Sequence, residues 1–147
     1  MGHSVEEGVS LARSGDHPAL VCRVRSGWVV LADMQYLSGY SILLADPVVS
    51  SLNDLEAAQQ ADFLLDMARV GSALLNATVA QRINYGIMCN TDPHLHAHIV
   101  PRYAGEPIEM LHNHPWAYPD EIMSHRLFDP DQDSELIRKL REAIQNL

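Results

Sequence analysis

The sequence has few cysteines and no long apolar segment, and each shortage argues against a class of protein. Its apolar runs fall well short of the about 20 residues that a transmembrane helix needs, so no membrane span is predicted. Its two cysteines, Cys22 and Cys89, follow no metal or redox spacing, which is typical of a reducing cytoplasm. Residues 1–7 lack a basic stretch followed by an apolar one, so they do not resemble a secretory signal. We therefore expect a cytoplasmic protein.

Basic residues are also scarce. The chain has 10 Lys and Arg against 19 Asp and Glu, which gives a net charge of −9 at pH 7. A surface of this sign repels a phosphate polymer over long range, so neither a nucleic acid polymer nor an anionic membrane is an expected partner. A small phosphorylated ligand, held by a few local donors, remains compatible with this charge.

Apolar periodicity predicts one α+β domain over residues 1–147, because no repeat, low-complexity tract or linker divides the chain. Apolar and β-branched runs predict strands over 20–24, 28–32, 40–44, 83–88 and 95–100. Helical spacing predicts a long helix with Asn53 as its N-cap and a last helix over 133–147. The acidic residues Asp62 and Asp66 are expected on the solvated face of the long helix. This order of elements favours an antiparallel sheet with its helices on one face.

Three histidines recur with a period of two just before Arg102, at His94, His96 and His98. Successive side chains of an extended strand point to opposite faces, so the period predicts three imidazoles on one face and apolar residues on the other. Packing alone does not explain three histidines on one face. This face is therefore the candidate site.

The segment from His94 to Arg102, His-Leu-His-Ala-His-Ile-Val-Pro-Arg, resembles the signature of the histidine triad (HIT) family. Ser38-Gly39-Tyr40 is similar to the family's Pro-Gly-His strand, and 51–55 to the start of its long helix. Asn84-Tyr85-Gly86 and Asn90-Thr91 are similar to its polar approach to the triad. The resemblance covers about residues 20–103 and leaves 104–147 as a C-terminal extension. It implies a HIT-like fold, with a five-stranded antiparallel sheet, one long helix and a C-terminal helix, and a homodimer acting at the α-phosphate of a small nucleotide.

The resemblance implies that His96 is the nucleophile and forms a covalent nucleotidyl-histidine that water then resolves. A neutral imidazole suits this role, because its reference pKa of about 6.5 leaves it uncharged and nucleophilic near neutral pH. One ring nitrogen attacks while the other keeps its proton, so a hydrogen-bond acceptor has to fix the tautomer, and the family supplies it from nearby backbone. His94 and His98 would flank the α-phosphate and donate hydrogen bonds to it. No cofactor and no metal are implied.

Further residues are candidates for substrate binding, each with an ordinary structural alternative. The resemblance suggests Asn84 at the phosphate, Asn90 in the polar approach to the triad, and Thr91 near the bridging oxygen or leaving group, although Asn and Thr also satisfy backbone groups in turns. Asp33 would accept ribose hydroxyls or cap a strand end. Arg102 would steer phosphate or form a surface or dimer ion pair.

His98 and Tyr40 bear on the branch of the family. Nucleotidylyltransferase and dinucleoside-polyphosphate phosphorylase relatives carry Gln at the third triad position, so His98 favours a hydrolase of nucleoside phosphoramidates or dinucleoside polyphosphates. Tyr40 stands where well-known branches have His, and its phenol donates a hydrogen bond without titrating near neutrality. Asp92-Pro93 replaces the usual small and β-branched pair in a segment one residue short. The Asp92 carboxylate is unfavourable beside an anionic substrate unless it points away.

Two other classes of function stay open. In one, the histidines hold Zn²⁺, with His112 and His114 completing the ligand set. His94 and His98 are about 13 Å apart along a strand, whereas two imidazoles bridged by one zinc span about 11 Å, so all three triad members do not share one ion. In the other, the chain is a catalytically weak nucleotide-binding or interaction protein. Trp116 and Tyr118 either stack on a base or pack in the core.

Overall fold

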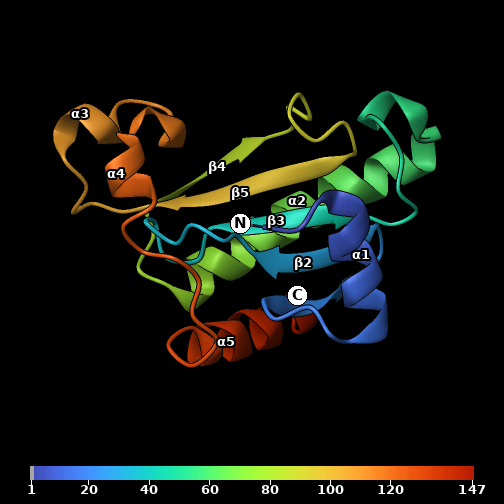
Figure 1. The fold of residues 1–147 in the computed structure, drawn as a ribbon, viewed down its shortest axis with the longest axis horizontal. Coiled ribbons are helices and arrows are strands. Elements are labelled where there is room, and N and C mark those ends of the chain that lie inside the picture. The colour runs from blue at the N-terminus through green and yellow to red at the C-terminus, as the bar shows by residue number, and fades with distance from the viewer. Residues whose placement is uncertain (1) are drawn as a thin grey trace.

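The structure, a computed structural model, describes residues 2–147 and is built on a five-stranded antiparallel sheet of strand order β1-β2-β3-β5-β4 (Figure 1). The strands are β1 (Leu20–Val24), β2 (Gly27–Leu31), β3 (Ser41–Ala45), β4 (Arg82–Gly86) and β5 (His96–Arg102). The helices are α1 (Val5–Ser14), α2 (Ala57–Ala77), α3 (Ile108–Leu111), α4 (Asp120–Met123) and α5 (Ser134–Gln145), with short 3₁₀ turns η1 (Leu52–Asp54) and η2 (Pro115–Ala117). The predicted α+β class and five antiparallel strands are confirmed.

The main core lies between one face of the sheet and helices α2 and α5. Inward-facing strand residues such as Leu43, Ala97 and Ile99 are fully buried there against Phe63 and Leu140. Helix α5 docks on its own chain, where the Arg141 guanidinium donates to the carbonyl of Val21 at 2.7 Å. Within residues 2–147, none of the helices is both long enough and apolar enough to cross a membrane.

The expectation that all helices occupy one face of the sheet is wrong. Helix α1 packs on the opposite face from α2, as Figure 1 shows with α1 in front of the sheet and α2 behind it. Its Val5 and Val9 form a separate cluster with Val30 and Leu44, which point away from the main core. The sequence does carry a signal for this helix, because Ser4 and Glu7 form a capping box at its start.

Helix α2 starts later than predicted. Asn53 lies in the 3₁₀ turn, and the N-cap of α2 is Glu56, which forms a capping box with Gln59. The side chain of Asp54 accepts hydrogen bonds from the amide and hydroxyl of Ser51, a local arrangement that competes with helix formation. The long helix therefore spans Ala57–Ala77.

The expectation that Asp66 is solvated is also wrong. Asp66 is only 2% exposed, and one carboxylate oxygen accepts hydrogen bonds from the amide (2.8 Å) and the hydroxyl (2.7 Å) of Ser26. These bonds tie α2 to the turn between β1 and β2. Asp62 instead forms an ion pair with the exposed Arg25 at 3.2 Å.

Candidate active site

The face of the sheet opposite α2 carries His96 and His98. The two histidines alternate along β5 with the buried Ala97 and Ile99, and their ring centroids are 5.0 Å apart. β5 begins at His96, but the preceding Leu95 is buried in the main core like Ala97 and Ile99, so the alternation of buried and half-buried residues runs from His94 to His98. Neighbouring β3 is in register, with Leu44 opposite His96 and Ile42 opposite His98.

The tautomer of His96 is fixed by the backbone. Its Nδ1 lies 2.8 Å from the carbonyl oxygen of His94, and a carbonyl oxygen can only accept a hydrogen bond. In the neutral ring the proton therefore sits on Nδ1, and Nε2 keeps its lone pair. The thiol of Cys89 lies 3.8 Å from the same Nδ1. The geometry thus leaves Nε2 as the nitrogen that can attack an electrophile.

The ring of His94 is engaged by carboxylates. Its Nδ1 donates to Asp92 at 2.8 Å, and its Nε2 is 3.7 Å from the Glu6 carboxylate of α1. The His94 imidazole is therefore held by these two acidic side chains, while its backbone carbonyl serves His96. Phosphate flanking by His94 stays a prediction that these contacts do not favour.

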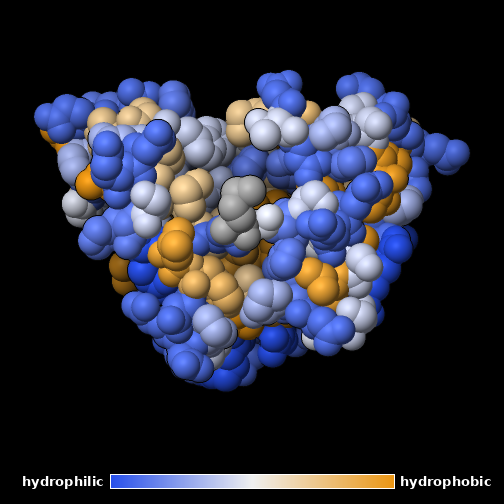
Figure 2. Space-filling model, in the orientation of Figure 1, coloured by the Kyte–Doolittle hydropathy of each residue, from blue (hydrophilic) through white to orange (hydrophobic). Residues whose placement is uncertain are grey.

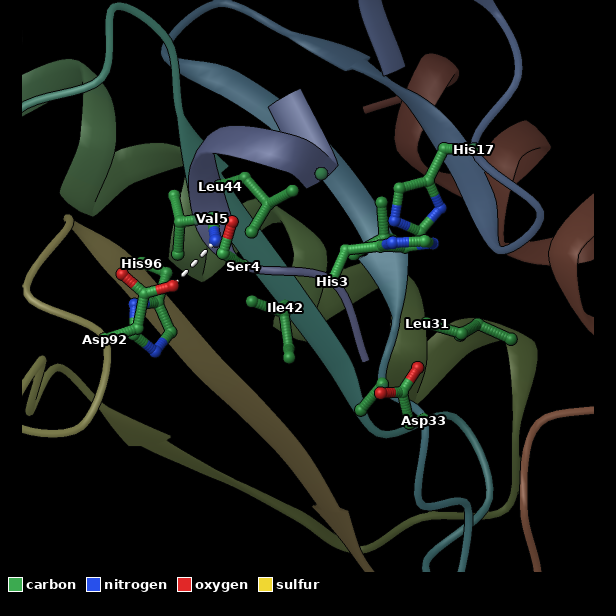
Figure 3. A pocket seen from close by; sticks show the side chains of 13 residues that line it. His3, Ser4, Val5, His17, Leu31, Asp33, Ile42, Leu44, Asp92 and His96 are labelled. Carbon is green, nitrogen blue, oxygen red and sulfur yellow. Dashed lines mark hydrogen bonds between the residues drawn. The ribbon is translucent and has the colours of Figure 1, made fainter. Parts of the chain in front are cut away.

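Asp92 points its charge at α1 and His94. Its second carboxylate oxygen accepts from the Val5 amide at 2.7 Å (Figure 3), at the positive end of helix α1. Partial burial acts to raise the pKa of Asp92, but the hydrogen bonds from Val5 and His94 outweigh it and hold the pKa below its ordinary value. Asp92 thus anchors helix α1, which was not predicted from the sequence.

His98 contacts Tyr40 and Trp116 above the sheet. The Tyr40 hydroxyl is 2.6 Å from His98 Nδ1, and the Trp116 indole packs edge-on against the His98 ring with centroids 5.4 Å apart. Burial, assisted by the nearby His96, lowers the pKa of His98 to about 4, so the ring is neutral at pH 7. Burial also raises the pKa of Tyr40, so its hydroxyl keeps its proton. Trp116 thus joins the site and also packs against a cluster of buried residues on this face, Ala32, Leu37, Tyr40, Val100 and Tyr118.

A cavity of about 140 Å³ lies between α1 and the sheet and ends at His96. Asp92 and His96 stand at one end and the exposed Asp33 at the other (Figure 3). Between them the walls are apolar side chains of β2 and β3, with His3 and His17 alongside. In Figure 2, hydrophobic residues gather near the centre of this side of the molecule inside a hydrophilic rim. The cavity is therefore apolar along its walls and has the Asp33 carboxylate at the end farther from His96.

A second cavity, of about 340 Å³, also borders His96. It is lined by residues 88–92, including the exposed Asn90 and Thr91, together with His96 and His98. His96 therefore lines both cavities, as does the neighbouring Asp92. Asn90, Thr91 and Asp33, all predicted from sequence, lie around these two spaces.

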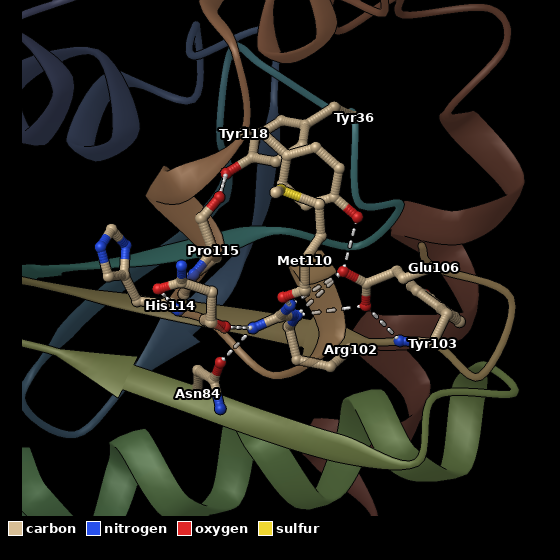
Figure 4. A network of polar contacts seen from close by, with 10 residues as sticks. Tyr36, Asn84, Arg102, Tyr103, Glu106, Met110, His114, Pro115 and Tyr118 are labelled. Atoms are coloured by element: carbon tan, nitrogen blue, oxygen red, sulfur yellow. Dashed lines mark hydrogen bonds and ion pairs between the residues drawn. The ribbon is translucent and has the colours of Figure 1, made fainter. Parts of the chain in front are cut away.

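Arg102 and Asn84 are bound to each other (Figure 4). Arg102 is only 3% exposed, and its guanidinium donates to the Glu106 carboxylate, to Asn84 Oδ1 and to the carbonyls of Met110 and Asn113. These bonds use all five N–H groups of a guanidinium. Arg102 therefore has no free donor for phosphate, and its ion pair is buried within the chain instead of lying on the surface.

The two further histidines predicted as zinc ligands are exposed. His112 and His114 lie on the C-terminal segment, and the His114 ring lies 6.2 Å from that of Trp116. Across residues 2–147, no group of three or more His, Cys, Asp or Glu side chains is arranged to hold a metal ion.

Comparisons with known proteins identify the fold. No family model and no curated protein matches the sequence. A histidine triad protein from Sinorhizobium meliloti is 19% identical, with a TM-score of 0.72 over 91% of this chain and 93% of that chain. A hypothetical histidine triad nucleotide-binding protein from Sulfolobus tokodaii is 16% identical, with a TM-score of 0.72 over 96% and 93%. A zinc-bound histidine triad family protein from Mycobacterium smegmatis is 22% identical, with a TM-score of 0.66 over 97% and 96%. The chain therefore has the fold of the histidine triad proteins.

Proposed function

We propose that this chain is a nucleotide hydrolase that acts at the α-phosphate through a covalent intermediate on His96. The observation that carries the proposal is the position of His96, whose Nδ1–H is held by the carbonyl of His94 while its ring lines both cavities. A nucleophile that borders two cavities can reach the phosphorus of a substrate whose nucleoside lies in one cavity and whose leaving group lies in the other. The histidine triad fold supports the same assignment.

The reaction then proceeds in two displacements. The lone pair of His96 Nε2 forms a bond to the α-phosphorus as the bond from phosphorus to the leaving group breaks, and the leaving group takes up a proton from solvent. Water then attacks the same phosphorus and releases a proton to solvent, the phosphorus–Nε2 bond breaks, and the nucleoside monophosphate leaves with His96 restored. The carbonyl of His94 stabilises the ring through the Nδ1–H bond as positive charge develops on it.

The cavities divide the substrate between them. We place the nucleoside in the smaller cavity, with its ribose hydroxyls toward Asp33, and the leaving group in the larger one, near Asn90 and Thr91. Asn84 and Arg102 do not contact substrate in this arrangement, because they bind each other and the C-terminal segment. Nucleoside phosphoramidates and dinucleoside polyphosphates fit this description. We place the protein in the cytoplasm, where its free cysteines Cys22 and Cys89 stay reduced.

A substrate screen tests the proposal. Purified protein is incubated with nucleoside phosphoramidates and dinucleoside polyphosphates, with and without chelator. We expect turnover that resists chelation, and we expect His96→Ala to reduce it by several powers of ten while nucleotide binding persists. His125→Ala, at an exposed histidine, is the matched control. Turnover by His96→Ala at the wild-type rate would refute the mechanism, and tightly held zinc with chelator-sensitive activity would replace it with a metal-dependent one.

A further inference from the structure

Tyr40, His98 and Trp116 form a hydrogen-bonded chain whose direction can be worked out from its donors and acceptors. The Trp116 indole N–H can only donate, and it donates to the Tyr40 oxygen at 3.2 Å. The Tyr40 hydroxyl has one proton of its own and is 2.6 Å from His98 Nδ1. Tyr40 is only 3% exposed, so that proton needs a partner inside the protein.

Only one arrangement of protons gives an acceptor to every hydrogen-bond donor between Trp116, Tyr40 and His98. If Nδ1 of His98 carried a proton, both it and the indole would donate to the Tyr40 oxygen, and the phenolic proton would have no acceptor among residues 2–147. A buried donor left without a partner costs about 1–3 kcal/mol. The satisfied arrangement has the indole donating to Tyr40 and Tyr40 donating to an unprotonated Nδ1.

The fold provides a place for the indole. Gly86 of β4 lies opposite His98 in the ladder, and a β-carbon at Gly86 would come within 3.0 Å of the Trp116 ring. The absence of a side chain at Gly86 therefore lets the ring approach the sheet beside His98. The turn that carries Trp116 is held by Tyr36, whose hydroxyl donates to the Pro115 carbonyl at 2.7 Å.

We propose that Trp116 and Tyr40 are positioning residues that hold neutral His98 with its proton on Nε2, where it can donate a hydrogen bond to the phosphoryl group or its leaving group. Nδ1 faces Tyr40, so Nε2 is the nitrogen left for the larger cavity, which His98 lines beside His96. The tautomer of His98 is a property of the free protein. Only its consequence for turnover rests on the proposed function.

The test reads the tautomer directly, by two-bond ¹H–¹⁵N correlation NMR of the ¹⁵N-labelled protein without ligand. We expect the wild type to show His98 protonated on Nε2. Tyr40→Phe removes the donor to Nδ1 and keeps the ring, so we expect a mixture of tautomers. Because a hydrogen bond to the neutral ring is lost while the ring stays buried, we expect only a modest rise in the pKa of His98 from about 4. Trp116→Phe should move both quantities in the same direction by less. Tyr85→Phe, which removes a hydroxyl from the opposite face, is the control and should leave the His98 signals unchanged.

Kinetics separate this inference from the proposed function. If the chain turns over nucleotides, Tyr40→Phe should lower kcat roughly ten- to a hundredfold and Trp116→Phe roughly two- to tenfold, with little change in KM. The expected tautomer in a protein that hydrolyses nothing would support the inference and refute the proposed function. A wild-type His98 protonated on Nδ1, or a Tyr40→Phe variant with unchanged tautomer and pKa, would overturn the inference whatever the turnover.

Discussion

At the residue scale, the low pKa of His98 couples its protonation to folding. A histidine in the unfolded chain has a pKa of about 6.5, whereas burial lowers that of folded His98 to about 4. At pH values between these two pKa values, His98 is protonated in the unfolded chain and neutral in the folded protein. The stability due to neutral His98 is therefore present above about pH 6.5 and is lost as the pH falls toward 4.

We predict that the free energy of unfolding falls by about 2 kcal/mol more between about pH 7.5 and pH 5 in the wild type than in His98→Gln. Glutamine cannot titrate, so the difference isolates the imidazole. Urea unfolding at the two pH values measures it, with His125→Gln at an exposed histidine as the control. Parallel pH profiles for the wild type and His98→Gln would show that burial of this ring is not coupled to its charge.

The sequence predicted part of the site at this scale. Alternation along a strand is a local rule, so it correctly gave His96 and His98 one face. The neighbour relations of Tyr40 and Trp116 depend on which strands pair and on where a loop returns, and neither follows from a local period. The burial of Arg102 was not predicted, because it depends on an ion pair with Glu106, which lies outside the strand.

At the element scale, helix α1 is set by its N-cap. Ser4 Oγ accepts from the Glu7 amide at 3.2 Å, while Glu7 accepts from the Ser4 amide at 3.1 Å. We predict that Ser4→Ala destabilises the protein by about 1 kcal/mol and speeds amide exchange in α1. Ser10→Ala, at an exposed position within the same helix, is the matched control and should not destabilise it. Equal stabilities for the two variants would contradict a capping role for Ser4.

The C-terminal segment 106–113 is anchored to the sheet by Arg102. A buried ion pair that loses one partner leaves an uncompensated charge, here the Glu106 carboxylate at 3.0 Å, whose pKa the pair holds below its ordinary value against the opposing effect of burial. We predict that Arg102→Met costs about 3–5 kcal/mol of stability. Arg82 is directly opposite in the ladder but exposed, so Arg82→Met should change stability by less than about 0.5 kcal/mol. A similar cost for both variants, measured by urea unfolding, would mean that the network does not stabilise the fold.

Secondary structure was predicted well where one pattern dominates. The strands were found to within two residues, because their apolar runs are bounded by turn residues such as Asp46-Pro47. Helix α1 was missed although its capping box is visible in the sequence. Helices α3 and α4 are too short to show a helical period.

At the scale of the whole molecule, α2 and β4 expose an apolar surface that suits a homodimer. Leu64 and Leu75 are 46% and 42% exposed and share one stripe of α2, where Tyr85 of the edge strand β4 packs over Gly71. We predict that light scattering at micromolar concentration gives about twice the chain mass of 16.4 kDa. Leu75→Asp should shift the protein toward monomer, whereas Ile122→Asp, equally exposed in α4, should not. A wild-type monomer under these conditions would refute the dimer.

The alternation of the triad histidines with apolar residues indicated the overall fold. It predicted a sheet with one face buried in the core and the other face carrying the candidate site. Placement of α1 across the face that carries the site was not predictable in this way, because it depends on the long-range bond between Val5 and Asp92. Val5 and Asp92 both line the smaller cavity beside His96, so this long-range contact helps to shape the proposed nucleoside site.

The central claim is that phosphoryl transfer passes through His96 in two displacements, and the stereochemistry at phosphorus tests it most directly. Each in-line displacement inverts the configuration, so two give overall retention. The measurement is hydrolysis, in ¹⁸O-labelled water, of a nucleoside substrate whose α-phosphorus is made chiral by a sulfur atom. We predict retention of configuration, with no turnover of the same substrate by His96→Asn. Inversion would show that water attacks phosphorus directly and that His96 is not the nucleophile.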